Sequence, residues 1–304
     1  MTAIDKLADK LKGQCPHMEL RRKEPMSAHS SFRIGGRVSA MAMPCSEDEL
    51  CACLRAAADA GVEPLVIGNG TNLLVRDGEL DIFVIKTFEG VGSIELEGED
   101  RIRAGAGALL SRVASSALKW GLSGMEFAYG IPGSLGGAVY MNAGAYGGEM
   151  KDIVSSVRWT DRGLELRETS GADCDFRYRG SRFSDEGGTV LSAEIKLEKG
   201  DPEAIRAKMD ELAAKRRASQ PLNFPSAGST FKRPAQGFAA ALIDQAGLKG
   251  KGFGGAKVSE KHAGFIINAG GATFDDVIKT MDYVKEQVFR HSGIELEPEV
   301  KIIR

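Results

Sequence analysis

Hydrophobic residues recur at helical spacing in several stretches of the chain. The first runs from Ile4 to Leu11, with charged residues between the apolar positions. Ser46 and Glu49 form a capping-box pattern at the start of the next helix, and we expect Phe289 to face the core from the last helix. After the first, the helices are expected over 46–61, 109–119, 201–218, 238–246 and 273–291.

Short apolar runs bounded by glycine lie between these helices and predict strands. They cover residues 64–70, 72–75, 81–87, 93–98, 101–107, 155–161, 188–198, 264–270 and 296–304. The order of elements predicts an N-terminal βαβ-like lobe, a strand-rich middle lobe, and a C-terminal α/β lobe that begins near residue 200.

Composition and charge narrow the class of protein. A chain of 304 residues is long enough for two or three lobes. Its net charge of −2 lacks the basic footprint of a nucleic-acid-binding protein, and no apolar run is long enough to predict a membrane span. The N-terminus lacks the pattern of a signal peptide. Five scattered cysteines predict reduced thiols in a cytoplasmic protein and no metal site.

Glycine is concentrated in two segments, GNGTNLLV over 68–75 and GIPGSLGGAVYMNAGAYGG over 130–148. Common nucleotide and hydrolase motifs do not fit. Leucine occupies the third glycine position of the dinucleotide fingerprint at both 68–73 and 105–110. Residues 250–257 have alanine where a P-loop needs lysine, and proline replaces the first glycine of a GxSxG elbow in the second segment. A Rossmann reductase, a P-loop NTPase and a serine hydrolase are therefore disfavoured.

Both glycine-rich segments combine glycine with Asn, Thr or Ser and contain no carboxylate. Backbone N–H groups in concave turns bind anionic oxygens, and small residues let a ligand approach the backbone closely. Two such segments favour a phosphate-bearing ligand over a pair of ordinary turns.

Together with five further blocks, these segments resemble the UDP-N-acetylenolpyruvoylglucosamine reductase family. The blocks occur in the family's order and cover nearly the whole chain. Only a short stretch separates Arg179 from the strand at 188–198, which resembles the shorter, type II branch that lacks a tyrosine-bearing loop. The blocks are SFRIGG (31–36), FRYRGSRF (176–183), AGSTFKRP (227–234), GGAKVSEKHAGF (254–265) and LEPEV (296–300).

The resemblance implies an α+β fold of the vanillyl-alcohol-oxidase, or PCMH, type with a C-terminal α/β substrate domain. One FAD-binding lobe is expected over 1–62, joined by the terminal strand at 295–304. A second FAD-binding lobe is expected over 63–200, and a substrate-binding domain over 201–294.

The implied activity is the NADPH-dependent reduction of UDP-N-acetylglucosamine enolpyruvate to UDP-N-acetylmuramate through non-covalent FAD, in peptidoglycan precursor synthesis. Ser229 matches the family's proton donor to C2 of the substrate. Arg179 is expected to hold the substrate carboxylate and stabilise the enolate. Glu299 matches the third catalytic position and is expected to act protonated or through a hydrogen bond. The expected state is a monomer without a nucleic-acid or membrane partner.

The resemblance places the FAD contacts in the two glycine-rich segments and the contacts to the UDP group on three cations. The expected FAD contacts are Gly68, Asn69, Gly70, Thr71, Asn72, Leu73, Gly130, Pro132, Gly133, Ser134, Gly136, Gly137, Ala138, Asn142, Ala143, Gly144 and Tyr146. The expected UDP contacts are Arg217, Lys232 and Lys261.

Two other interpretations remain open. The chain could be another oxidoreductase of the same flavin fold, with FAD attached covalently through His29 or Cys45. It could also be a binding module for a flavin or sugar nucleotide that has lost its chemistry. The presence of Arg179, Ser229 and Glu299 argues against a silent module.

Overall fold

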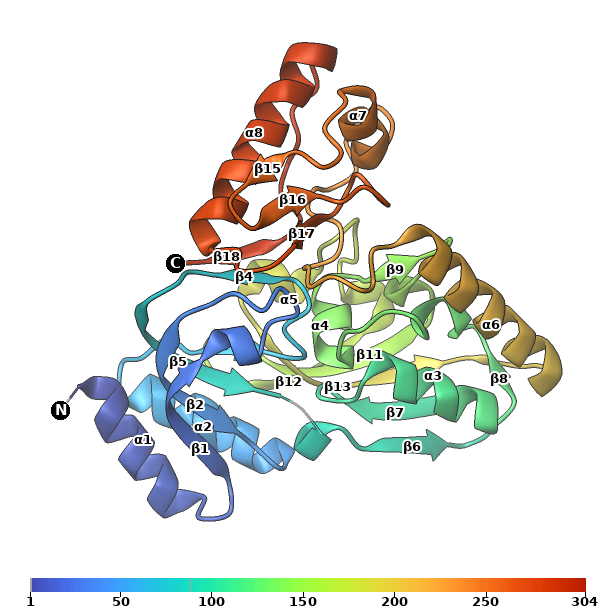
Figure 1. Ribbon diagram of the computed structural model, residues 1–304. Coiled ribbons are helices and arrows are strands. Elements are labelled where there is room, and N and C mark those ends of the chain that lie inside the picture. The colour runs from blue at the N-terminus through green and yellow to red at the C-terminus, as the bar shows by residue number, and fades with distance from the viewer. Residues whose placement is uncertain (1, 88) are drawn as a thin grey trace. The chain divides into compact units, whose positions relative to one another are not determined.

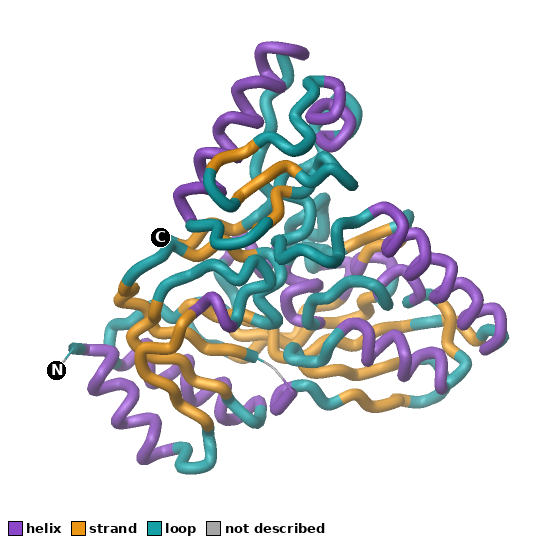
Figure 2. Tube along the Cα trace, in the orientation of Figure 1, coloured by secondary structure: helices purple, strands orange, loops and turns teal. Residues whose placement is uncertain are grey.

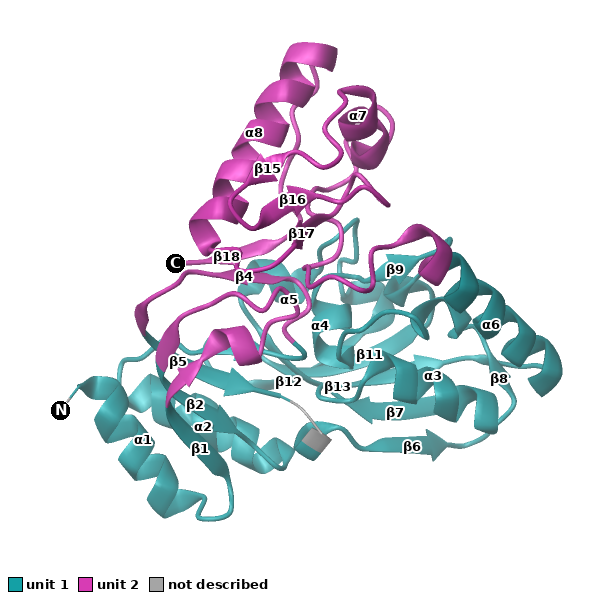
Figure 3. Ribbon diagram, viewed as in Figure 1, with its two compact units in different colours: residues 1–22, 39–69, 81–215 teal, residues 23–38, 70–80, 216–304 magenta. Residues whose placement is uncertain are grey.

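The computed structural model describes residues 2–87 and 89–304, and the chain divides into two compact units (Figure 3). Each unit mixes helices with strands and has its own buried apolar core. Unit 1 consists of residues 1–22, 39–69 and 81–215. Unit 2 consists of residues 23–38, 70–80 and 216–304. The finer division into lobes over 1–62, 63–200 and 201–294 stays a prediction.

The first sheet, most of whose residues belong to unit 1, has the strand order β1-β2-β5-β3, and two helices cover it (Figure 1). These elements are β1 (Glu19–Pro25), β2 (Arg37–Met43), β5 (Glu79–Lys86), β3 (Leu65–Ile67), α1 (Ala3–Gln14) and α2 (Glu47–Asp59). Ser46 caps α2 by accepting the N–H of Glu49, as predicted. The Glu49 carboxylate accepts the N–H of Cys45 rather than that of Ser46, so the capping box is incomplete.

The second sheet of unit 1 has five antiparallel strands in the order β12-β11-β13-β7-β6. They are β12 (Leu166–Ser170), β11 (Val154–Thr160), β13 (Thr189–Lys196), β7 (Arg101–Gly105) and β6 (Ile94–Glu97). Two-stranded pairs add β8 (Leu122–Ser123) with β14 (Glu198–Lys199), and β9 (Gly144–Ala145) with β10 (Gly148–Glu149). The helices of this part are α3 (Leu110–Lys119), α4 (Leu135–Tyr140), α5 (Arg182–Glu186) and α6 (Pro202–Ser219).

Helix α4 lies inside the second glycine-rich segment, where the sequence predicts no helix. Glycine disfavours a helix interior by roughly 0.5–1 kcal/mol relative to alanine. Tertiary hydrogen bonds hold the segment in place. The N–H of Leu135 donates to the carbonyl of Ala108, and the N–H of Gly136 donates to that of Ala106, each at 2.8 Å. Packing against the β7–α3 connection therefore overrides the local preference.

Unit 2 contains a parallel pair, β4 (Leu73–Val75) with β18 (Lys301–Ile303), and a small antiparallel sheet. The small sheet consists of β15 (Gly252–Phe253), β16 (Ala256–Val258) and β17 (Ile266–Asn268). Its helices are α7 (Ala239–Gln245) and α8 (Phe274–Ser292). Irregular backbone occupies most of 220–238, between α6 and α7 (Figure 2).

Helix α8 forms where the sequence predicts it, between a Thr273 cap and Gly293. Its buried face repeats at Val277, Met281, Val284 and Val288, but Phe289 is 51% exposed. The prediction that Phe289 faces the core was wrong. One residue is a rotation of about 100° on a helix, so Phe289 lies beyond the stripe that Val288 completes.

Candidate active site

The two glycine-rich segments touch each other within unit 1. The Asn69 side-chain Nδ2 donates to the carbonyl of Pro132 at 2.6 Å. A Cβ atom on residue 68 would lie 2.0 Å from the Ser134 Oγ, so only glycine fits there. Ser134 is 1% exposed, and its hydroxyl has no hydrogen-bond partner among the residues that the structure describes. A buried hydroxyl in that state costs free energy, and a polar ligand group would relieve it.

Gly136 and Gly137 are neighbours in α4, but glycine is present for different reasons. A Cβ on residue 136 would lie 2.8 Å from the Cβ of Ala106, so close packing requires the glycine. Outside its own helix backbone and among the described residues, a Cβ on residue 137 would meet only the Ser134 Oγ, at 3.7 Å, which is ordinary contact. Gly137 is also exposed. Packing inside the protein therefore does not explain Gly137, whereas a ligand lying against the backbone would.

Asn142 joins the end of the second glycine-rich segment to the chain around Arg177. Its side chain is 1% exposed and its φ is 43°. The Nδ2 group donates to the Glu149 Oε2 at 2.8 Å and to the Arg177 carbonyl at 3.1 Å, and Oδ1 accepts the N–H of Lys151 at 2.9 Å. Protein groups thus occupy the polar atoms of Asn142, and its FAD contact stays a prediction.

Arg179 lies in a tight turn in which Arg177 and Gly180 exchange both backbone hydrogen bonds, at 3.0 and 3.1 Å. Its φ is 55°, which an L-residue adopts only where the surroundings hold it. Its guanidinium lies 5.0 Å from the centre of the Tyr178 ring, and its Nη2 lies 3.5 Å from the carbonyl oxygen of Gly144. The turn therefore presents Arg179 beside the β9–β10 hairpin.

Two other arginines in the FRYRGSRF block pair with carboxylates. The Arg177 Nη2 lies 2.5 Å from the Asp185 Oδ1. The Arg182 guanidinium lies 3.4 Å from a carboxylate oxygen of Asp175 and 3.4 Å from one of Glu186. The Arg179 guanidinium instead lies near the ring of Tyr178 and the carbonyl of Gly144.

The rest of the first glycine-rich segment, residues 70–75, belongs to unit 2. Gly70 has φ 63°, and a Cβ there would lie 1.9 Å from the carbonyl oxygen of His29. Ser31 donates its N–H to the Gly70 carbonyl, and the Ser30 hydroxyl donates to the Leu73 carbonyl. The SFRIGG block and the residue before it therefore hold these residues.

His29 is 8% exposed, and its Nε2 bonds to the Glu24 Oε1 at 2.8 Å. This buried pairing argues against His29 as a covalent attachment point for a flavin.

Ser229 and Glu299 lie on two neighbouring stretches of backbone in unit 2. The N–H of Glu299 donates to the carbonyl of Thr230 at 2.8 Å, and the N–H of Lys232 donates to that of Glu297 at 2.8 Å. Ser229 is exposed and Glu299 is half-buried. The structure thus brings together two predicted catalytic residues that are 70 positions apart in the sequence.

Asn72 connects the glycine-rich segment to Glu299. Its Nδ2 donates to the Glu299 carbonyl at 3.1 Å, and its own carbonyl accepts the N–H of Lys301 at 2.9 Å. The parallel pairing of β4 with β18 continues this contact. The backbone at Glu299 is therefore fixed on two sides, by Thr230 and by Asn72.

Two of the three predicted UDP contacts are neighbours. The Nζ of Lys261 donates to the carbonyl of Arg217 at 2.6 Å, and both side chains are exposed. Lys232 instead pairs with the Glu297 carboxylate and is half-buried.

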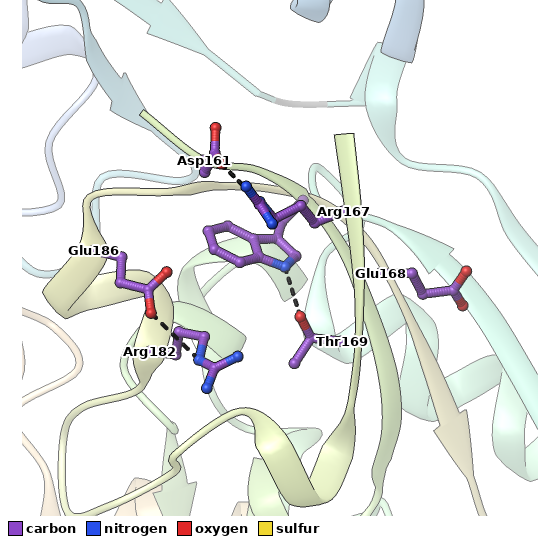
Figure 4. A pocket seen from close by; sticks show the side chains of 7 residues that line it. Asp161, Arg167, Glu168, Thr169, Arg182 and Glu186 are labelled. Carbon is purple, nitrogen blue, oxygen red and sulfur yellow. Dashed lines mark hydrogen bonds and ion pairs between the residues drawn. The ribbon is translucent and has the colours of Figure 1, made fainter. Parts of the chain in front are cut away.

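A separate polar cavity of about 620 Å³ lies in unit 1 and contains none of the predicted site residues (Figure 4). Two of its acids pair with its two arginines, Arg167 with Asp161 at 2.7 Å and Arg182 with Glu186 at 3.4 Å. Because its arginines are already paired in this way, the cavity is a weaker candidate than the glycine-rich segments.

Comparison with known proteins decides the family. Residues 220–303 match the C-terminal domain of UDP-N-acetylenolpyruvoylglucosamine reductase, and residues 38–170 match an FAD-binding domain. The chain is 47% identical to the UDP-N-acetylenolpyruvoylglucosamine reductase of Caldanaerobacter subterraneus subsp. tengcongensis over 98% of both chains. The chain belongs to the UDP-N-acetylenolpyruvoylglucosamine reductase family.

Two further members of the UDP-N-acetylenolpyruvoylglucosamine reductase family are similar to this chain over most of its length. The enzyme of Clostridioides difficile is 45% identical over 94% of this chain and 93% of its own. The crystal structure of UDP-N-acetylenolpyruvylglucosamine reductase from Thermus caldophilus matches with a TM-score of 0.82 and 32% identity, over 94% of this chain and all of the other. These matches confirm the predicted family and the predicted α+β, FAD-binding fold.

The FAD-binding match includes both glycine-rich segments and thus confirms the predicted cofactor. Within the described residues, no helix is both long and apolar enough to cross a membrane.

Sequence reasoning missed two residues of this region, Glu149 and Thr230. Glu149 carries the first charge after the second glycine-rich segment, which was a usable signal. Thr230 carried no comparable signal, because its role depends on backbone pairing with a distant segment.

Proposed function

We propose that this protein reduces UDP-N-acetylglucosamine enolpyruvate to UDP-N-acetylmuramate with NADPH and non-covalent FAD, as a step of peptidoglycan precursor synthesis. The observation that carries the proposal is the backbone pairing of 230–232 with 297–300, which leaves Ser229, the residue before Thr230, close to the backbone of Glu299 in a chain of this family.

The glycine-rich segments fit FAD. Ser134 contributes a buried hydroxyl without a protein partner, and Gly137 leaves the backbone open. We infer that residues 68–73 and 130–146 hold the cofactor. Gly136 contributes indirectly, because its close packing against Ala106 fixes the backbone of this segment. When bound there, FAD would supply the redox chemistry, namely hydride transfer between NADPH and C3 of the enolpyruvyl group.

Three side chains then act on the substrate. The Arg179 guanidinium binds the substrate carboxylate and stabilises the negative charge that develops on it, because its planar fork matches a carboxylate. The Ser229 hydroxyl donates a proton to C2, for which an exposed side chain in hydrogen-bond reach is suitable. Glu299 acts protonated or through a hydrogen bond that orients its neighbours. Its backbone N–H bonds to the carbonyl of Thr230, the residue after Ser229.

The remaining assignments concern the contacts to the UDP group, the oligomeric state and the location in the cell. Arg217, Lys232 and Lys261 bind the UDP group, and the hydrogen bond from the Lys261 Nζ to the main-chain carbonyl of Arg217 shows that two of the three are neighbours in the fold. We infer a monomer in the cytoplasm, where cysteines such as the five free ones found here stay reduced. Light scattering of the purified protein tests the monomer.

The deciding experiment measures NADPH oxidation by the purified protein with and without UDP-N-acetylglucosamine enolpyruvate. Substrate-dependent oxidation is expected. In Ser229→Ala, NADPH should still bleach the flavin, while reoxidation by substrate slows about 10²–10⁴-fold because the proton donor is lost. Ser226→Ala, three residues earlier in the same stretch, is the matched control and should react normally.

Several outcomes would contradict the proposal. FAD binding without any substrate-dependent oxidation would support a silent module. Flavin that precipitates with denatured protein would support covalent attachment. Equal loss of both half-reactions in Ser229→Ala would remove the proton-donor role.

A further inference from the structure

Glu149 lies on the β9–β10 hairpin, directly across from Gly144. A Cβ on residue 144 would lie 2.7 Å from the Cγ of Glu149, so the glutamate side chain covers the space that a side chain at 144 would fill. The carbonyl oxygen of the same Gly144 lies 3.5 Å from the Arg179 Nη2. The hairpin thus places the Glu149 side chain over the residue that Arg179 contacts.

The Glu149 carboxylate is itself held in place. Its Oε2 accepts a hydrogen bond from Asn142 Nδ2 at 2.8 Å and lies 3.1 Å from the Nζ of Lys151. Burial alone would raise the pKa of Glu149, but the hydrogen bonds from Lys151 and Asn142 and the charges of Lys151 and Arg179 hold that pKa below its usual value. Glu149 is therefore negatively charged at neutral pH.

The hydrogen bonds of Asn142 join Glu149 to the turn that carries Arg179. The other hydrogen bond of the Asn142 Nδ2 group goes to the carbonyl of Arg177, two residues before Arg179. One buried side chain thereby fixes the distance between the Glu149 carboxylate and the Arg177–Gly180 turn. A buried, fully bonded amide is a rigid connection, because breaking it leaves unpaired polar atoms.

We propose that Glu149 is a positioning residue for Arg179, which holds the guanidinium over the Gly144 carbonyl so that its fork faces the substrate carboxylate. The inference rests on the proposed role of Arg179. Long arginine side chains have high rotamer freedom, and a neighbouring carboxylate restricts it. Glu149 also adds negative charge beside an anion-binding site, so its removal should not weaken substrate binding.

This combination gives a signature that a purely structural role lacks. In Glu149→Gln, reoxidation of reduced flavin by saturating substrate should slow at least about tenfold, because the guanidinium is less well oriented in the transition state. The dissociation constant of the substrate from the oxidised holoenzyme, measured by titration, should stay unchanged or fall. The FAD affinity, the melting temperature and the rate of flavin reduction by NADPH should match the wild type.

The matched control is Asp185→Asn, which removes the carboxylate partner of Arg177 in the same block and should leave reoxidation unchanged. Glu149→Asp keeps the charge but shortens the side chain by one methylene, so an intermediate slowing is expected. In an Arg179→Ala background, Glu149→Gln should have no further effect, within about twofold, because the two residues act as one unit.

The outcomes separate this inference from the proposed function. Arg179→Ala could slow flavin reoxidation while Glu149→Gln slows it further by its full factor in the double variant. That result would overturn the role of Glu149 and leave the proposed function intact. Weaker FAD or substrate binding in Glu149→Gln would also overturn that role, since the residue would then be structural. Normal reoxidation in Arg179→Ala would overturn the role of Arg179 and, with it, this inference.

Discussion

The adjacent glycines of α4 allow a sharp test of where FAD lies. We consider Gly136→Ala and Gly137→Ala, which make the same chemical change one residue apart in one helix. Each replacement gains about 0.5–1 kcal/mol from the smaller backbone entropy of alanine. Gly13→Ala is the matched control, because Gly13 lies in α1 and a Cβ there would meet no atom of the described residues within 4 Å outside its own helix backbone.

The structure gives the two variants opposite effects on the apoprotein. At residue 136, the new Cβ would lie 2.8 Å from the Ala106 Cβ and 3.2 Å from the Ala106 carbonyl oxygen. Overpacking of this kind costs about 1–3 kcal/mol, so the free energy of unfolding should fall by about 1 kcal/mol after the entropy gain is subtracted. At residue 137 nothing is crowded, and the apoprotein should gain up to about 1 kcal/mol, as Gly13→Ala should.

FAD binding should then separate Gly137→Ala from Gly13→Ala, although the two variants have similar effects on the stability of the apoprotein. If the cofactor lies against the open backbone at Gly137, an added methyl group there should weaken FAD affinity at least tenfold, or about 1.4 kcal/mol. Urea unfolding of the apoprotein gives the stabilities, and quenching of FAD fluorescence gives the affinities. Wild-type FAD affinity in Gly137→Ala would refute the placement of FAD, and a stabilised Gly136→Ala would refute the packing argument.

Three further predictions follow from single side chains. Lys261→Met should raise the KM for the UDP substrate about tenfold with kcat unchanged, since a binding contact is lost equally from ground and transition states; a fall in kcat alone would contradict this. Burial lowers the pKa of His262 below its usual 6.5, so the unfolded chain binds more protons and stability should fall as pH drops from 7.5 to 5.5, by at most about 1.4 kcal/mol per pH unit. Urea titrations at several pH values should show that the free energy of unfolding of His262→Gln depends less on pH than that of the wild type. The same pH dependence in both proteins would contradict a role of His262. Burial raises the pKa of Cys53 and Cys174 to about 12, so these two thiols should react slowly with a thiol reagent at pH 8. The exposed Cys45 should react rapidly, and Cys45→Ser should remove the rapid phase of the reaction.

The long helices were predictable because their signals are local. The sequence predicts helices over 201–218 and 273–291, and the structure has them at Pro202–Ser219 and Phe274–Ser292. Caps and a repeating apolar face lie within the helix itself, so one window of sequence contains the information. Phe289 marks the limit, because at the edge of an apolar stripe the packing partner decides which side chain is buried.

The short helix α4 was not predictable by the same means. Its backbone is fixed by the carbonyls of Ala106 and Ala108, which lie about thirty residues earlier. Glycine density correctly indicated a surface without side chains at Gly137, but it concealed the tight packing at Gly136. Composition alone cannot separate a glycine required by a neighbour from one required by a ligand.

The candidate site shows the same division between motif and geometry. Family blocks identified Ser229 and Glu299, but their placement on adjacent backbone depends on the bond from Glu299 to Thr230 across 69 positions. Asn72 adds what the blocks could not indicate. It lies in the segment expected to hold FAD, yet its side chain and carbonyl bond to Glu299 and Lys301. Because Asn72 bonds to both residues, a shift of the backbone at 70–73 would move the backbone of Glu299. With FAD and Glu299 in their proposed roles, we expect Asn72 to couple cofactor binding to catalytic geometry.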